Sequence, residues 1–233
     1  MNPGQIVILN GAPRAGKSSI VRVIQDTFEG VWMNLGVDVF ARGVTPKRYQ
    51  PGIGLRPGPG PGLGGDAPEL EPFVPTFYAA VYESIAAHSR LGLNVVTEGG
   101  HHGAIHPDVL GDCARRLAGL PVLFVGVRCP IEVIMKRRDQ AGREGGYAVG
   151  TDAEPVPAPV VLWQEEVHKP GIYDLEVDTS LLSPEECAEL IARCHEEDGL
   201  EFIGIACLNL PSERQARLEY LQMIGEEFVS RLP

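Results

Sequence analysis

One eight-residue motif constrains the fold of this 233-residue chain more than any other feature. Residues 11–18, Gly-Ala-Pro-Arg-Ala-Gly-Lys-Ser, match the pattern G-x-x-x-x-G-K-S. The two glycines of this pattern let successive backbone N–H groups curve around phosphate oxygens. Residues 5–9 precede the motif as a mostly apolar, strand-like run, and residues 17–28 carry apolar side chains at helical spacing. This strand–loop–helix context is the one that the motif requires, so it predicts a phosphate-binding loop.

Each conserved position of the motif pattern has a mechanical reason. Lys17 is expected to reach the β- and γ-phosphates of a nucleotide, and the Ser18 hydroxyl is suited to bind Mg²⁺. The N-terminus of the following helix adds partial positive charge. Arg14 either contacts the nucleotide or points to solvent. The motif thus predicts ATP and Mg²⁺ as ligands. The residues expected to bind them are Gly11, Ala12, Pro13, Arg14, Ala15, Gly16, Lys17, Ser18 and Ser19.

Strand-like and helix-like segments alternate along most of the chain. Apolar runs at 5–9, 31–35, 93–97, 121–127 and 173–177 indicate buried strands. Helical periodicity occupies 17–28, 73–90, 107–118, 130–141 and 183–197, and Ser183-Pro184-Glu185-Glu186 is a strong helix start. The alternation predicts an α/β, three-layer P-loop NTPase fold with a mainly parallel five-stranded sheet.

Two segments have compositions that exclude regular structure. Residues 51–72 contain a glycine–proline run and form either a tolerated surface insertion or an element that closes on substrate. Residues 142–159 lie between two helices, and we interpret 137–160 as a lid. We expect one domain over 1–198, with 199–233 packed on it as a C-terminal extension that includes a helix over 211–232.

Two carboxylates end strands that neighbour the phosphate-binding loop in such a fold. Ligands bind beyond the carboxyl ends of parallel strands, so Asp38 is a candidate general base for an acceptor hydroxyl. Its alternative role is a helix N-cap. Glu98 occupies the position of a carboxylate that holds Mg²⁺, and its alternative is a solvated turn residue.

Arginines near the interpreted lid are candidates to stabilise charge on a transferring phosphoryl group. Arg137, Arg138 and Arg143 lie on or after the helix at 130–141, and the alternative for each is a solvated helix face. We expect at least one to contact ATP, with Arg137 in nucleotide binding and Arg138 and Arg143 in catalysis. Arg128, which ends a strand, is expected to form a structural ion pair.

Composition excludes several other classes of protein. The net charge of −11 and the absence of a long basic run argue against a nucleic-acid partner. Five cysteines without a C-x-x-C pair favour reduced thiols, and no apolar stretch is long enough to span a membrane, so we expect a cytoplasmic protein. The spacing of three histidines does not favour a metal site; they are His101, His102 and His106.

The sequence resembles the chloramphenicol phosphotransferase-like family of P-loop kinases over about residues 5–195. The resemblance rests on Ile8–Gly11, Gly36–Asp38, Val125–Cys129, Val167–His168 and Tyr173–Ser180. It implies a nucleoside- or shikimate-kinase-like sheet, Mg-ATP as the phosphoryl donor, and a hydroxyl acceptor. It also implies matching roles for Lys17, Ser18, Asp38 and the lid arginines.

These observations predict a small-molecule O-phosphotransferase whose hydroxylated acceptor includes antibiotics such as chloramphenicol among the candidates. A nucleotide-binding switch and an NTP hydrolase without an acceptor remain the alternatives, and a homo-oligomer stays open. Aromatic residues in the acceptor-side segments either stack on a flat ligand or fill the core; they are Phe40, Phe73, Phe77 and Tyr78.

Overall fold

The central sheet carries the fold, and all of its strands run in parallel. A computed structural model describes residues 2–44, 74–100, 109–141, 150–151, 153–169 and 171–197. Within this part of the chain the strand order is β2-β3-β1-β4-β5. The strands are β1 (Ile6–Asn10), β2 (Trp32–Asn34), β3 (Asn94–Gly99), β4 (Val122–Arg128) and β5 (Leu175–Asp178). The α/β class and the five-stranded parallel sheet are therefore confirmed.

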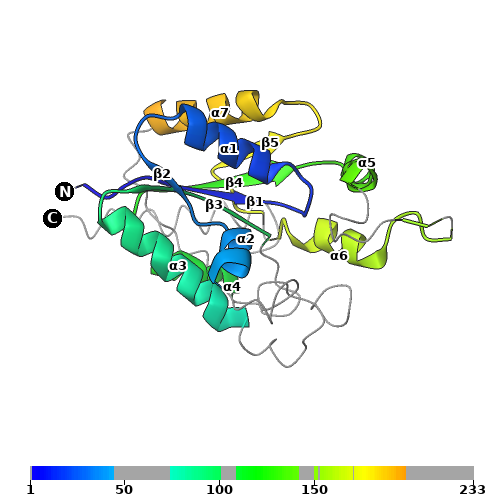
Figure 1. The fold of residues 1–233 in the computed structure, drawn as a ribbon, viewed down its shortest axis with the longest axis horizontal. Coiled ribbons are helices and arrows are strands. Elements are labelled where there is room, and N and C mark those ends of the chain that lie inside the picture. Colours follow the sequence, from blue (N-terminus) through cyan, green and yellow to red (C-terminus); the bar gives the residue numbers. More distant parts are fainter. Residues whose placement is uncertain are drawn as a thin grey trace, which may run out of the picture.

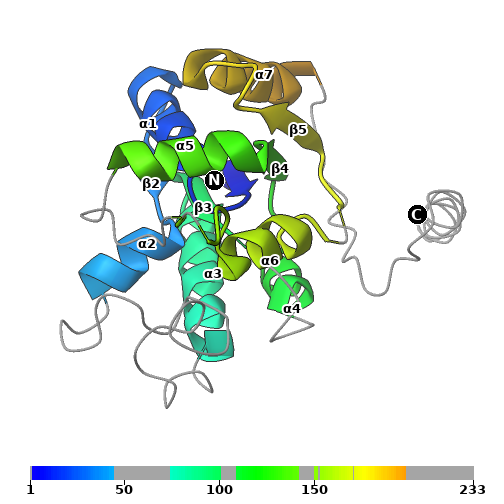
Figure 2. The same cartoon turned by 90° about the vertical axis from the view of Figure 1, so that its right-hand side faces the viewer.

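Helices cover both faces of this sheet, which gives the three layers that the alternation predicts. The helices are α1 (Lys17–Thr27), α2 (Val37–Val39), the π-helical turn η1 (Phe40–Val44), α3 (Val74–Arg90), α4 (Val109–Arg116), α5 (Ile131–Ala141), α6 (Ala158–Glu166) and α7 (Pro184–Glu197). Figure 1 shows α1 and α7 on one face of the sheet and α3 and α4 on the other. Figure 2 views the carboxyl edge of the sheet, where α5 and α6 lie in front of the strands.

The central strand β1 shows why the core has two halves. Successive side chains of a strand point to opposite faces, and helices cover both faces here, so every residue of β1 is buried. Val7 and Leu9 pack with residues of α1 and α7, whereas Ile6 and Ile8 pack with residues of α3 and α4. The burial of β1 on both faces fixes the position of the loop that follows it.

The segment boundaries expected from sequence lie within two residues of those observed. The helix start at Ser183 is confirmed in detail, because the Glu186 N–H donates to Ser183 Oγ and the Ser183 N–H donates to Glu186 Oε2. The short α2 and η1 were anticipated only by the alternative interpretation of Asp38 as a helix N-cap. Helix α6 begins at Ala158, within the segment expected to be irregular. Residues 51–72 and 199–233 lie outside the described residues.

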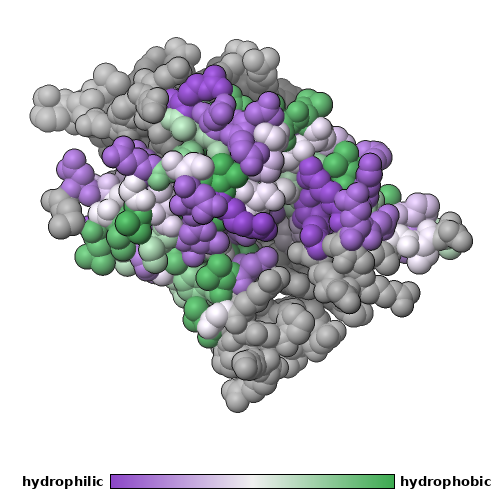
Figure 3. All heavy atoms as spheres, turned by 45° about the horizontal axis from the view of Figure 1, so that its top comes forward, coloured by the Kyte–Doolittle hydropathy of each residue, from purple (hydrophilic) through white to green (hydrophobic). Residues whose placement is uncertain are grey.

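The described surface carries mainly hydrophilic residues on the face that Figure 3 presents, with hydrophobic residues in small groups. Large exposed apolar side chains such as Val31, Leu91 and Leu181 are separated along the chain. Isolated exposed apolar residues of this kind are ordinary in globular proteins. Among the described helices, none combines the length and the apolar character needed to cross a bilayer.

Candidate active site

The phosphate-binding loop connects the carboxyl end of β1 to the first residue of α1. Two of its residues have positive φ angles, Arg14 at 71° and Gly16 at 100°. The Ala15 N–H closes a turn by donating to the Ala12 carbonyl at 3.0 Å. The left-handed conformation at Gly16 is one that glycine adopts without a steric cost, so the second glycine of the motif is required where α1 starts.

Thr179, which directly follows β5, and Arg137 of α5 hold this loop. The Thr179 hydroxyl donates to the Ala15 carbonyl at 2.6 Å. The Arg137 guanidinium donates to the Arg14 carbonyl at 3.2 Å and to Thr179 Oγ1 and O at 3.0 and 2.7 Å. Two of these bonds satisfy carbonyl oxygens of the loop itself, those of Arg14 and Ala15. Arg137 therefore braces the loop, which is a more specific position than the solvated helix face that the sequence left open.

Lys17 lies folded over the loop. Its Nζ donates to the Gly11 carbonyl at 2.8 Å and to the Ala12 carbonyl at 2.9 Å. Burial lowers the pKa of Lys17, while the nearby carboxylates of Glu98 and Asp38 act in the opposite direction. The ammonium group is thus placed among the residues that the motif assigns to phosphate binding.

Ser18 and Glu98 meet at the carboxyl end of β3. The Ser18 hydroxyl donates to Glu98 Oε2 at 2.8 Å, and Glu98 is only 8% exposed. Glu98 is therefore not the solvated turn residue of the alternative interpretation. A hydroxyl and a carboxylate side by side are the ligand types that Mg²⁺ prefers, so this pair fits a magnesium site.

Asp38 lies in the first turn of α2 with its residue exposed. The N-cap of α2 is Gly36, so the N-cap interpretation of Asp38 is wrong. Asp38 interacts electrostatically with Lys17 and with the buried Tyr78 on α3. The carboxylate of Asp38 therefore lies near Lys17 of the loop and near Tyr78 of α3.

The remaining predicted residues separate into three groups. Arg14 is partly buried, and Arg138 on α5 is 5% exposed and belongs to the interior of the structure. Arg143 and the three histidines at 101, 102 and 106 lie outside the described residues. Arg128 forms the expected ion pair, with Glu176 of β5. In the described ranges no cluster of three His, Cys, Asp or Glu side chains is arranged to hold a metal ion.

Four described cysteines have free thiols, and they are Cys113, Cys129, Cys187 and Cys194; Cys207 lies outside the described residues. Of the aromatic residues considered for the acceptor side, Tyr78 is part of the core, whereas Phe40 and Phe77 are partly buried against it. Phe73 lies outside the described residues. Core filling therefore accounts for Tyr78 at least.

Sequence reasoning missed the roles of several residues around the loop. Thr179 directly follows β5, and a hydroxyl residue at the carboxyl end of a parallel strand is a signal that could have been used. Trp163 on α6 packs on the backbone near Gly100, because a methyl group on Gly100 would lie 2.6 Å from the ring atom Cζ3. Asn10 and Tyr173 both contact the carbonyl of Val167, the C-cap residue of this helix.

Comparison with known proteins places this geometry in a known family. Residues 4–196 match the family described as chloramphenicol phosphotransferase-like protein. A protein of Mycobacterium tuberculosis (strain H37Rv) with the provisional name O-phosphotransferase is 26% identical over 203 residues, which cover 81% of this chain and 80% of that protein.

Solved structures of kinases share the fold. A sugar kinase from Janibacter sp. HTCC2649 has a TM-score of 0.54 and 19% identity, covering 84% of this chain and 96% of that one. Shikimate kinase from Acinetobacter baumannii, solved with shikimate, has a TM-score of 0.54 and 14% identity, covering 86% and 96%. The match to the family spans most of the chain and includes every residue of the site described above. The chain therefore belongs to the chloramphenicol phosphotransferase-like family.

Proposed function

We propose that this protein transfers the γ-phosphoryl group of Mg-ATP to a hydroxyl group of a small molecule. One observation carries the proposal: Lys17, the Ser18–Glu98 pair and Asp38 converge at the carboxyl edge of the sheet. The phosphotransferase family supports the reaction type. Phosphoryl transfer requires positioning and charge stabilisation more than covalent chemistry, and these residues supply both.

Each of these residues has a definite task in this reaction. The backbone N–H groups of residues 11–18 would bind phosphate oxygens, and Lys17 would exchange its two carbonyl partners for them. Ser18 and Glu98 would hold Mg²⁺, which supplies positive charge beside the phosphates when bound. Asp38 would accept the proton of the acceptor hydroxyl and orient its oxygen for attack.

The acceptor would enter between α2 and α3. Asp38 lies on that side of the loop, and the partly buried Phe40 and Phe77 lie on the elements that border it. Apolar side chains with a few polar groups are typical of pockets for small ligands. Chloramphenicol and other hydroxylated antibiotics are candidates on this basis, together with hydroxylated metabolites.

Asp38 provides the sharpest test of the proposal. Wild type and Asp38→Ala would be incubated with Mg-ATP and a panel of hydroxylated antibiotics and metabolites, and phosphorylated products identified by mass spectrometry. We expect one acceptor to be phosphorylated by wild type and the product to be lost in Asp38→Ala, while binding of ATP is retained. Asp26→Ala, which changes an exposed aspartate of α1, is the matched control and is expected to behave as wild type.

Other outcomes would redirect the assignment. Consumption of ATP without any modified acceptor would indicate a hydrolase, and binding without turnover would indicate a nucleotide-dependent switch. Full activity in Asp38→Ala would remove Asp38 from the mechanism but leave the nucleotide site intact.

A further inference from the structure

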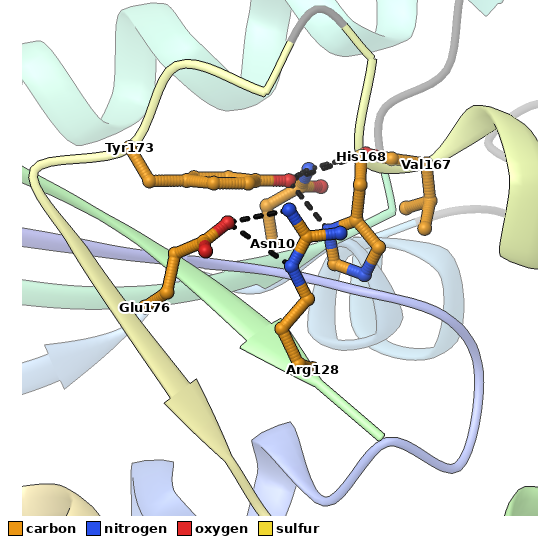
Figure 4. Close-up of polar contacts among 6 residues, drawn as sticks. All are labelled: Asn10, Arg128, Val167, His168, Tyr173 and Glu176. Atoms are coloured by element: carbon orange, nitrogen blue, oxygen red, sulfur yellow. Dashed lines mark hydrogen bonds and ion pairs between the residues drawn. The ribbon is translucent and has the colours of Figure 1, made fainter. Parts of the chain in front are cut away.

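A row of three residues crosses the sheet beside the phosphate-binding loop. Asn10 of β1 is in register with Gly126 of β4, which is in register with Glu176 of β5. A methyl group on Gly126 would lie 2.5 to 2.8 Å from three ring atoms of Tyr173. The ring of Tyr173 therefore occupies the space that a side chain at position 126 would need, and it brings its hydroxyl to Asn10 (Figure 4).

The ring of Tyr173 is held on its other sides as well. Arg128 lies with its guanidinium carbon 5.7 Å from the ring centroid, and its Nε donates to Glu176 Oε1 at 3.0 Å. Phe124 packs against the ring at a centroid distance of 4.9 Å. The position of the hydroxyl is thus fixed by the packing of the ring.

Asn10 uses its amide to join the strand to a helix. The residue is 1% exposed, and Nδ2 donates to the Val167 carbonyl at 2.8 Å and to the Tyr173 hydroxyl oxygen at 2.9 Å. Val167 is the C-cap residue of α6. Carbonyl groups at the end of a helix lack intrahelical partners, so Asn10 satisfies an acceptor that would otherwise be costly to bury.

The Tyr173 hydroxyl contacts Val167 and also His168, the residue that follows it. It lies 2.8 Å from His168 Nδ1 and 3.3 Å from the Val167 carbonyl (Figure 4). Burial and the positive charge of Arg128 lower the pKa of His168 to about 4, so its ring is neutral at neutral pH. Because Asn10 donates to the phenol oxygen, the phenol proton is available for the neutral Nδ1.

Helix α6 contacts the site at two further points. The Trp163 ring packs on the backbone at Gly100, in the space next to the Gly11 carbonyl that also accepts from Lys17. Gln164 Nε2 donates to the Cys129 carbonyl at 2.8 Å. Asn10 and Tyr173 hold α6 at its C-cap residue Val167, which is one turn away from Trp163. The attachment of this helix end therefore determines the position of the Trp163 ring.

We infer that Asn10 and Tyr173 are positioning residues, which hold α6 against the strand that carries the phosphate-binding loop and thereby keep Trp163 over Gly11 and Gly100. The effect on nucleotide binding rests on the proposed function, whereas the effect on Trp163 does not. Losing the hydroxyl of Tyr173 removes its contacts with Asn10, His168 and the Val167 carbonyl and leaves the Asn10–Val167 bond, so the end of α6 is held more weakly.

Tyr173→Phe tests this inference, because it removes only the hydroxyl and retains the ring over Gly126. In a Trp32→Phe background Trp163 is the remaining tryptophan, and its exposure can be followed by acrylamide quenching of fluorescence. Glu176→Gln is the matched control, because the amide oxygen can still accept from Arg128 beside the Tyr173 ring and no group bonded to α6 is changed. Hydrogen exchange of residues 160–168 in the native tryptophan background repeats the measurement if Trp32→Phe destabilises the fold.

In Tyr173→Phe we expect greater quenching of Trp163, faster exchange in 160–168, and about tenfold weaker binding of MgAMPPNP, the equivalent of one buried hydrogen bond. Glu176→Gln should have the same Trp163 quenching, the same exchange rates and the same affinity for MgAMPPNP as the protein without this substitution. The inference is overturned if Tyr173→Phe lowers only the melting temperature and otherwise behaves as Glu176→Gln. If the parent does not bind MgAMPPNP, the proposed function fails, and quenching and exchange still decide the positioning role.

Discussion

Two polar clusters lie on opposite faces of the sheet at the same edge. Glu98 is in register with Leu9 and faces α1, which carries Lys17 and Ser18, whereas Asn10 follows Leu9 and faces the side of α3 and α4 together with Tyr173. The first cluster is charged and contains the exposed Ser18. The second is neutral at its centre, with its hydrogen bonds made within the protein.

This difference indicates what each cluster is for. Charged groups that bond to loop carbonyls or to one another, as these do among the described residues, can exchange those partners for a ligand. Neutral groups whose donors and acceptors are paired with one another cannot exchange partners for a ligand in this way. Their loss disturbs the packing around them. The charged cluster is therefore the candidate site and the neutral one its support, and variants in each should separate activity from stability.

The largest expected effect follows from Lys17→Ala. Removing the ammonium group should lower the rate of phosphoryl transfer by about 10² to 10³-fold, because a preorganised cation beside the phosphates is lost. The melting temperature should not fall, since a partly buried charge is removed. Lys136→Ala on the exposed side of α5 is the control. A Lys17→Ala rate within a few per cent of wild type would exclude Lys17 from the reaction.

Glu98→Gln should sharpen the assignment of the magnesium site. The amide retains the shape of the side chain and can still accept from the Ser18 hydroxyl, but it removes the negative charge. We expect the Mg²⁺ concentration for half-maximal activity to rise about 10- to 100-fold. Titration with Mg²⁺ at saturating ATP measures this. An unchanged titration curve would mean that Glu98 does not contact the metal ion.

Gly126→Ala should act on stability through the neutral cluster. The added methyl group would overlap the Tyr173 ring, which must move, and we expect a loss of about 2 kcal/mol in the free energy of unfolding. Gly43→Ala is the matched control, because no heavy atom of the described residues lies within 4 Å of the position that its methyl group would take. Equal denaturation midpoints for the two variants would show that the ring is not confined.

The smallest expected effect is the pH dependence contributed by His168. Its pKa is lowered from 6.5 to about 4 by burial and by Arg128, so between these values the unfolded state binds more protons. The contribution to stability is complete above pH 6.5 and is lost as the pH falls toward 4. His168→Gln should flatten the stability profile in that window, measured by urea unfolding. A profile identical to that of wild type would argue against a neutral His168.

Local patterns in the sequence were sufficient to predict the residues of the charged cluster. The motif at 11–18 specifies a strand, a loop and a helix in immediate succession, and Glu98 ends a recognisable strand. The role of Arg137 could be predicted from the sequence only in part. A guanidinium near the lid is equally suited to a phosphate and to backbone carbonyls, and its bonds to Arg14 and Thr179 depend on the position of β5.

The neutral cluster could not be predicted from local patterns. Asn10 and Tyr173 are 163 residues apart, and their meeting depends on the order in which β1, β4 and β5 pair. Helix α6 was difficult for a different reason, because prolines at 155, 157 and 159 indicate an irregular chain. Proline is tolerated in the first turn of a helix, where its missing N–H is not needed, and α6 begins there.

The packing of Tyr173 on Gly126 carries a consequence for the divergence of related sequences. Gly126 cannot take a side chain unless Tyr173 changes, since the ring lies where the methyl group of an alanine would be. Positions 126 and 173 should therefore vary as a pair. Relatives with a side chain at the first position should have lost the aromatic ring at the second, and they should carry another group that reaches the buried amide at position 10.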